Sequence, residues 1–127
     1  MELVRRSFGL ANAGELDAAM QFLSPDVEWV VAREHPEART VVGLRAVAEY
    51  FRTWEETMPN LSLKLDRVLD GGEKVVSTGW VTGVGTGSGA EVEVPIAFVY
   101  TFRHGLVVRV EEYLNPHEAL KAVGLEE

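Results

Sequence analysis

The spacing of apolar residues changes once along this chain, and the change restricts the folds open to it. In three segments before about residue 58 they recur every three or four positions, as in Leu44, Val47 and Phe51, which is the spacing of one helix face. From Leu61 onward they alternate with polar residues, as in Leu61 and Leu63, which is the period of a strand. The sequence therefore predicts helices first and a sheet afterwards.

Turn and cap residues divide the chain into a defined order of elements. The predicted helices span about 3–11, 16–23 and 44–57, and a short terminal helix spans 117–123. The predicted strands span 26–31, a segment from 61, then 74–84, 91–103 and 106–114, and residues 33–42 are expected to be a connection. Pro25 is expected to end the second helix. Helices gathered before four antiparallel strands indicate an α+β fold, with helices on one face of a curved sheet.

Four glycines at every second position, Gly83 to Gly89, raise the question of a phosphate-binding loop. A dinucleotide fingerprint needs G-x-G-x-x-G between a strand and a helix. Here the spacing is G-x-G-x-G-x-G, and the residues that follow, 91–100, have a strand pattern. No lysine follows as in a P-loop, and no helix N-terminus is available to hold phosphate. The stretch is therefore predicted to be a loop that joins two long strands.

Length and composition exclude several classes of function. The 127 residues suit one domain, residues 1–127, and the net charge of −8 disfavours a nucleic-acid partner. The chain has no cysteine and no apolar run of membrane-spanning length. The N-terminus lacks the apolar core of a signal peptide, so the cytoplasm is the expected location. Three scattered histidines lack ligand spacing, so neither a metal nor another cofactor is expected.

Several short segments together carry a resemblance to a known family. They are Ala11–Asp17 between the first helices, Leu23–Trp29 into the first strand, Val42–Val47 opening the long helix, Phe102–Val107 at the last turn and Glu112–Leu120 at the end. In this order and spacing the chain resembles the SnoaL-like branch of the nuclear transport factor 2-like superfamily. The resemblance covers nearly the whole chain.

The resemblance implies a cone-shaped α+β barrel, in which a bent antiparallel sheet wraps against the N-terminal helices around an apolar pocket. It implies a small apolar molecule as ligand and a homodimer formed through the outer sheet face, near Arg109, Glu111 and Tyr113. The family includes isomerases, cyclases, epoxide hydrolases and non-catalytic binding modules, so the fold leaves the function open.

Two known catalytic sets of the family are incomplete in this chain. The ketosteroid isomerase positions fall at Ser7, at Val30 or Val31, and at Phe98, where the required tyrosine, base and aspartate are absent. The Arg-x-Asp pair of limonene-type epoxide hydrolases would fall around residues 79–81, which hold no charge. The carboxylate of the last strand matches Glu112, which is also the nearest match to the acid of SnoaL-like cyclases.

Strand parity decides what Glu112 can do. Val108, Val110, Glu112 and Leu114 share one face of the last strand, and Arg109 shares the opposite face with Glu111 and Tyr113. If the first face points inward, Glu112 lies among apolar residues, where burial raises the pKa of an acid and suits it to proton transfer. If a bulge inverts the parity, Glu112 is a surface acid, and Arg109 and Glu111 point inward as an ion pair.

The remaining candidates are aromatic residues expected to line the pocket or the core. They are Trp29, Tyr50, Trp54, Trp80 and Phe98, with Val110 beside them. Tyr50 and Tyr100 are candidate hydrogen-bond donors to a ligand carbonyl, and Tyr100 is paired with Glu112 as a candidate catalytic residue. Glu34 and His35 are either an acid–base pair at the pocket mouth or a surface loop. Two functions follow, a cofactor-free acid–base enzyme and a non-catalytic module that binds a small ligand or only dimerises.

Overall fold

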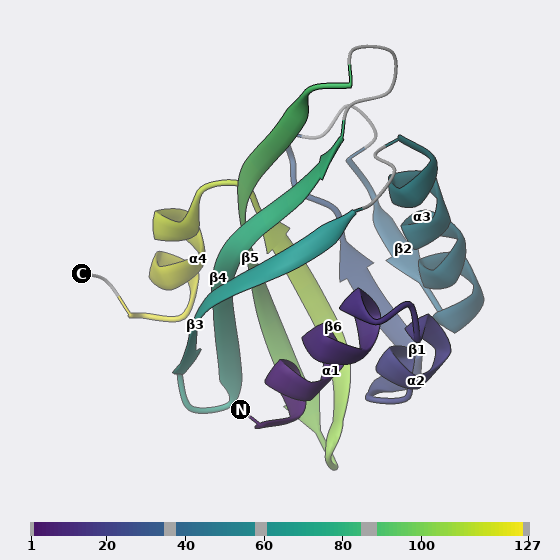
Figure 1. The fold of residues 1–127 in the computed structure, drawn as a ribbon. Coiled ribbons are helices and arrows are strands. Elements are labelled where there is room, and N and C mark those ends of the chain that lie inside the picture. The colour runs from purple at the N-terminus through teal and green to yellow at the C-terminus, as the bar shows by residue number, and fades with distance from the viewer. Residues whose placement is uncertain (1, 35–37, 58–60, 85–88, 126–127) are drawn as a thin grey trace.

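A computed structural model of the protein describes residues 2–34, 38–57, 61–84 and 89–125 (Figure 1). In chain order the elements are α1 (Glu2–Asn12), α2 (Leu16–Met20), β1 (Leu23–Val30), β2 (Thr40–Val42), α3 (Leu44–Thr57), β3 (Ser62–Asp70), β4 (Lys74–Val84), β5 (Glu91–Arg103), β6 (Leu106–Tyr113) and α4 (Pro116–Ala122). Apart from β2, helices and strands follow the predicted succession, and the α+β prediction is confirmed.

The strands form one curved sheet in the order β2-β1-β6-β5-β4-β3. Neighbouring strands are antiparallel except β1 and β6, which are parallel. Figure 1 shows α1, α2 and α3 on one side of the sheet and α4 on the other. The larger core lies between the inner face and the first three helices, and a smaller core forms where Ala119 and Leu120 of α4 pack on Val76, Ala97 and Val99.

A close approach between β3 and β4 contributes to the bend of the sheet. The register of the two strands shifts between Leu65 and Arg67, as a β-bulge does when it bends and twists a strand. Opposite the bulge, a Cβ on Gly79 would overlap the backbone carbonyl oxygen of Lys64. Glycine is required here by the space between the strands.

Two predicted boundaries at the start of the sheet are wrong. The second helix ends at Met20, and β1 begins at Leu23, so Pro25 lies inside a strand instead of ending a helix. The pairing of β1 with β6 is interrupted between Leu23 and Glu28, and such an interruption accommodates a residue without an N–H. The expected connection 33–42 contains β2, which pairs with β1 and is too short to show a periodic pattern.

The glycine stretch joins two strands, as predicted. β4 and β5 are antiparallel and stay paired up to Val84 and Glu91, while residues 85–88 lie outside the described part of the chain. The hairpin between β5 and β6 turns at His104 and Gly105, both with positive φ (54° and 80°), which is typical of a two-residue hairpin loop.

Asn12, at the end of α1, attaches the helices to the edge strand β3. Its side-chain amide donates to the carbonyl oxygen of Leu63 at 2.7 Å and accepts from the Leu63 N–H at 2.8 Å. The asparagine side chain thus pairs with both backbone groups of one residue on an edge strand, which has no neighbouring strand there.

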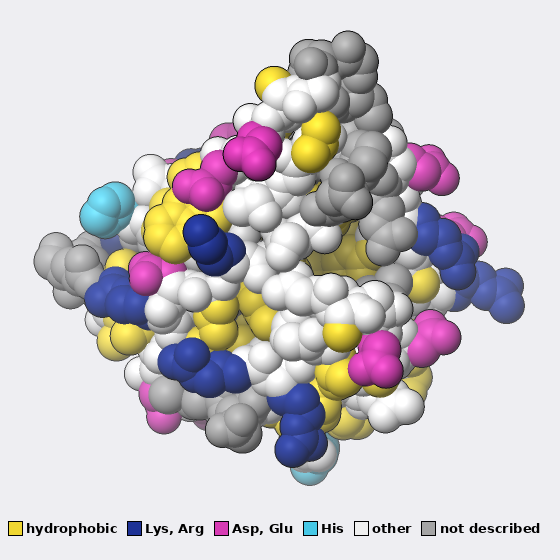
Figure 2. Space-filling model, viewed as in Figure 1, with side chains coloured by type: hydrophobic (Ala, Val, Ile, Leu, Met, Phe, Trp, Pro, Cys, Tyr) yellow, Lys and Arg dark blue, Asp and Glu magenta, His cyan; other side chains and the backbone are white. Residues whose placement is uncertain are grey.

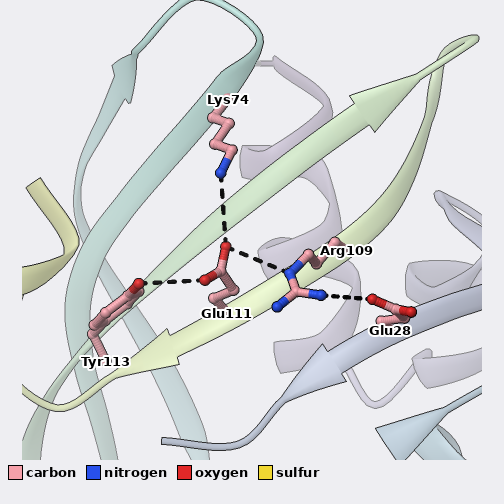
Figure 3. Close-up of polar contacts among 5 residues, drawn as sticks. All are labelled: Glu28, Lys74, Arg109, Glu111 and Tyr113. Atoms are coloured by element: carbon pink, nitrogen blue, oxygen red, sulfur yellow. Dashed lines mark hydrogen bonds and ion pairs between the residues drawn. The ribbon is translucent and has the colours of Figure 1, made fainter. Parts of the chain in front are cut away.

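The outer face of β1, β6, β5 and β4 carries a polar cluster (Figure 3). Arg109 pairs with Glu28 at 2.6 Å and with Glu111 at 3.7 Å, and Lys74 lies 3.9 Å from Glu111. The Tyr113 hydroxyl donates to Glu111 at 3.4 Å. Among the described residues, no helix is both long and apolar enough to cross a membrane.

Candidate ligand-binding site

A pocket of about 160 Å³ lies between α1, α2, α3 and the inner face of the sheet. The described lining contains six aromatic residues, Phe8, Trp29, Phe51, Trp54, Phe98 and Tyr100, together with aliphatic residues and a few polar ones that include Glu112. Figure 2 shows a recess with apolar surface between α1 and the start of β3. A cavity of this size and character can hold a molecule of about one aromatic ring or slightly more.

Glu112 points into this pocket, so the first of the two parity alternatives holds. Only 6% of the residue is exposed, and Glu112 stands opposite Phe98 on β5. A bulge is present, but it lies earlier in β6, where the register shifts between Thr101 and Phe102. It turns Val107 inward with Val110, and Val108 is only partly buried. The expectation that Val108 shares the inner face is therefore wrong.

Protein donors reach both oxygens of the Glu112 carboxylate. The indole N–H of Trp29 donates to Oε2 at 2.6 Å, and the backbone N–H of Ala32 donates to Oε1 at 3.3 Å. The Tyr50 hydroxyl lies 2.8 Å from Oε2 and 3.0 Å from Oε1. Hydrogen bonds to an ionised carboxylate are strong and fix its orientation. They come from β1, the segment after it, and α3, so the fold itself places this acid.

Tyr50 connects the carboxylate to the aromatic side of the pocket. Its ring packs edge-to-face against Trp54, one turn further along α3, with 6.2 Å between the ring centres. Burial raises the pKa of Tyr50 well above its usual value, and the charge of Glu112 adds to the shift. A tyrosine in this state stays neutral, so the hydroxyl remains a donor to Glu112.

Tyr100 has a buried partner of its own. Its hydroxyl lies 3.1 Å from the Ser77 hydroxyl on β4, and either atom can be the donor. Ser77 is fully buried and Tyr100 is 7% exposed. Burial raises the pKa of Tyr100 above its usual value, and the bond to Ser77 only partly opposes this. Tyr100 is therefore a neutral hydroxyl at the pocket wall.

The other sequence candidates divide between the pocket and its surroundings. Trp29, Trp54 and Phe98 line the pocket. Tyr50 and Val110 belong to the core around it, and Tyr50 reaches the site through Glu112. Trp80 lies elsewhere, in a depression on the outer face with Thr78, Pro95 and Leu120.

The placement of Trp80 in the central pocket is thus wrong, and strand parity gives the reason. Val75, Ser77 and Val81 of β4 face inward, so Trp80 faces outward. Because α4 covers part of the outer face, β4 is apolar on both sides, and its sequence lacks a clean alternation.

Of the histidines that the structure describes, His104 and His117, neither lines the pocket. His35 lies outside the described residues, and Glu34 is exposed. His104 is the turn residue of the last hairpin, and His117 lies in the first turn of α4, where Asn115 accepts a hydrogen bond from its N–H. No group of three or more potential metal ligands occurs among the described residues.

Sequence reasoning missed two contributors to the site. The Ala32 N–H is a backbone group, so no side chain in the sequence indicates that it donates to Glu112. Ser77 stands opposite Phe98 in the pairing of β4 and β5. Paired residues point to the same face of a sheet, so this pairing would have placed the Ser77 hydroxyl on the aromatic face of β5.

The sequence of residues 4–110 matches the family model of the SnoaL-like domain. The chain belongs to the SnoaL-like family. No curated protein matches its sequence. Solved structures of SnoaL-like and related proteins share the fold at low identity. A nuclear transport factor 2-like protein of unknown function from Burkholderia pseudomallei is 21% identical, with a TM-score of 0.81 over 97% of this chain and 95% of the other.

Two further solved structures with a similar fold are named after two different groups of proteins, the polyketide cyclases and the ketosteroid isomerases. A SnoaL-like polyketide cyclase candidate from Jannaschia is 23% identical, with a TM-score of 0.76 over 88% of this chain and 82% of the other. A Catenulispora acidiphila protein with a ketosteroid isomerase-like fold, in complex with trimethylamine, is 18% identical, with a TM-score of 0.76 over 98% of this chain and 93% of the other. At such identities the likeness shows the fold alone, so function has to be inferred from the side chains of this SnoaL-like chain.

Proposed function

We propose that this protein binds a small, largely apolar molecule in the central pocket and orients it by a polar contact with Glu112. The observation that supports this most is a buried carboxylate in the wall of an aromatic pocket. An apolar enclosure with a few placed polar groups is the usual composition of a small-molecule site. The contacts from Trp29, Ala32 and Tyr50 hold Glu112 in one position, as a ligand anchor requires.

Acid–base catalysis is the second candidate, and the relation of Glu112 to Tyr100 favours it. Phe98 pairs with Glu112 and Tyr100 pairs with Val110, so the two polar side chains are diagonal neighbours facing one pocket. In this candidate Glu112 accepts a proton from the carbon next to a ligand carbonyl. The neutral Tyr100 hydroxyl donates a hydrogen bond to the carbonyl oxygen, where charge develops.

One compound can test binding and catalysis together. Indan-1-one is neutral, largely apolar and has exchangeable hydrogens beside its carbonyl. Binding is measured by calorimetry, and hydrogen–deuterium exchange at that carbon is followed by NMR. We expect saturable binding to the wild type that is lost in Ala11→Phe, which adds a ring at the pocket wall, and kept in Ala13→Phe, an exposed position outside the lining.

The catalytic candidate is decided by a matched pair of variants. Glu112→Gln removes the base, and Glu111→Gln makes the same change one residue away on the outer face. Accelerated exchange in the wild type and Glu111→Gln but not in Glu112→Gln supports catalysis. If indan-1-one binds and its hydrogen–deuterium exchange is not accelerated, the protein binds the ketone without catalysing this proton transfer. Binding that survives Ala11→Phe refutes the central pocket as the site.

We also propose that the protein forms a homodimer through the outer sheet face. The polar cluster around Arg109 and Glu111 lies on that outer face (Figure 3), and its Tyr113 packs on the smaller core beside α4. Opposite charges interspersed on one surface give a second copy complementary partners.

A further inference from the structure

We infer that the ligand of the central pocket presents an acceptor oxygen to the Tyr100 hydroxyl, as a ketone does, and that Ser77 is the positioning residue that makes Tyr100 the donor. This rests on the proposed function and names its ligand class. It holds whether or not Glu112 acts as a base.

The hydroxyls of Tyr100 and Ser77 form a pair with one hydrogen left over. Their oxygens lie 3.1 Å apart, and the bond between them uses one of the two hydroxyl hydrogens. Neither side chain has another hydrogen-bond partner among the described residues. The remaining hydrogen therefore belongs either to Ser77 or to Tyr100.

Burial decides which of the two hydroxyls keeps the remaining hydrogen. Ser77 has no exposed surface and is not among the described lining residues, whereas Tyr100 lines the pocket. If Tyr100 donates to Ser77, the Ser77 hydrogen is buried without an acceptor, which costs about 1–3 kcal/mol. If Ser77 donates to Tyr100, the remaining hydrogen is on Tyr100, where a ligand or water in the pocket can accept it. The second arrangement is therefore favoured.

The other hydroxyls of the described lining already donate within the protein. Ser7 Oγ donates to the carbonyl oxygen of Val4 at 3.0 Å, and Ser62 Oγ donates to Asn12 Oδ1 at 3.4 Å. Among the lining hydroxyls that the structure describes, Tyr100 is thus the one whose hydrogen remains for a ligand.

The surroundings of Tyr100 favour a ligand that accepts this hydrogen. Its strand neighbours are the buried residues Val75 on β4 and Val110 on β6, and the centre of the Phe98 ring lies 6.1 Å from that of its own ring. In such apolar surroundings an unpaired donor is costly, so a ligand without an acceptor at this point is disfavoured. Because burial raises the pKa of Tyr100, the hydroxyl keeps its hydrogen.

Two ligands of one shape isolate the acceptor oxygen. Indan-1-one and 1-methyleneindane differ by an oxygen in place of a CH₂ group. Each ligand is compared between the wild type and a variant, so the different hydrophobicity of the two compounds cancels. In calorimetry, Tyr100→Phe should weaken binding of indan-1-one about 10-fold and change binding of 1-methyleneindane less than about 2-fold. Tyr113→Phe, which removes a hydroxyl from the outer face, should affect neither.

Ser77→Ala tests the direction of the bond between the two hydroxyls. It should weaken binding of indan-1-one about 3-fold, because the Tyr100 hydroxyl loses a donor that polarises and orients it. If Tyr100 donates to Ser77 instead, the same change releases the Tyr100 hydrogen and tightens binding. Ser7→Ala is the matched control. It removes a lining hydroxyl that already donates to Val4 and should leave the affinity within about 2-fold.

The infrared carbonyl stretch of bound indan-1-one gives a readout that a purely structural effect does not move. A hydrogen bond from Tyr100 lowers this frequency in the wild type below its value in hexane. The frequency should rise in Tyr100→Phe and, by a smaller amount, in Ser77→Ala. A wild-type frequency equal to that in hexane overturns the inference, and this comparison decides the matter even if Tyr100→Phe does not fold.

The binding outcomes separate the inference from the proposed function. Binding of 1-methyleneindane, together with ketone binding that Tyr100→Phe leaves unchanged, overturns the inference and leaves the proposed binding function intact. Unchanged or tighter binding of the ketone by Ser77→Ala also overturns the inference. If neither compound binds to the wild type, the proposed function fails as well.

Discussion

Removing one hydroxyl, by Tyr50→Phe, tests whether the hydrogen bonds to Glu112 stabilise the fold. The substitution keeps the buried ring and deletes only the atom that lies 2.8 Å and 3.0 Å from the two carboxylate oxygens. A hydrogen bond to a charged group contributes about 1.5–3 kcal/mol. Because the hydroxyl reaches both oxygens of a buried carboxylate, the expected destabilisation lies in the upper part of this range.

The expected loss converts into a measurable shift in melting temperature. An unfolding entropy of about 2.1 cal/mol/K per residue amounts to roughly 0.27 kcal/mol/K for a chain of this length. A loss of about 2–3 kcal/mol therefore lowers Tm by about 7–11 °C. Urea unfolding followed by tryptophan fluorescence gives the free energy directly, provided that the m-value is unchanged.

Tyr113→Phe is the matched control for this prediction. Its hydroxyl is half-buried on the outer face and makes a long contact of 3.4 Å to Glu111, so its removal should change the unfolding free energy by less than about 0.5 kcal/mol. If Tyr50→Phe lowers the unfolding free energy no more than Tyr113→Phe does, the Tyr50 hydroxyl does not stabilise the buried carboxylate of Glu112. Combining Tyr50→Phe with Glu112→Gln should give a coupling of at least about 1 kcal/mol, and strictly additive effects would count against the same reasoning.

Three further predictions concern the sheet, the tyrosines and the proposed dimer. Gly79→Ala should lower the unfolding free energy by about 2 kcal/mol or more, because the new Cβ meets the Lys64 carbonyl. Gly9→Ala in α1, where a Cβ meets nothing within 4 Å, should raise it by up to about 1 kcal/mol, and equal effects in urea unfolding would contradict the packing argument. Because burial raises the pKa of Tyr50 and Tyr100, the unfolded chain releases their protons above about pH 10 while the folded chain keeps them. Stability that is complete below this pH should then fall by about 1.4 kcal/mol per pH unit for each tyrosine, and tyrosinate absorbance from more than one residue before unfolding would be inconsistent with this. Arg109→Glu places a third acid beside Glu28 and Glu111 and should shift sedimentation from dimer toward monomer; an unchanged dimer would exclude this part of the face from the interface.

Most of the elements were predictable because their signals are local. The apolar stripe of α3, the turn at His104 and Gly105, and the strand pattern after the glycine stretch are each contained in a few consecutive residues. The errors lie where a partner strand decides the outcome. Pro25 lies in a strand because the pairing of β1 with β6 is interrupted beside it, and β2 is a strand only because β1 pairs with it.

For the site, the sequence alone determined that an acid on the last strand has apolar neighbours at alternate positions, as Glu112 has Val110. Only the tertiary structure decided that this face turns inward, that Trp80 turns outward, and that Trp29, Ala32 and Tyr50 donate hydrogen bonds to Glu112. Those three lie 62 to 83 residues away in the chain. Hydrogen bonds over such separations depend on how the sheet curves and on where α3 packs on it. A local pattern of residues determines neither of these.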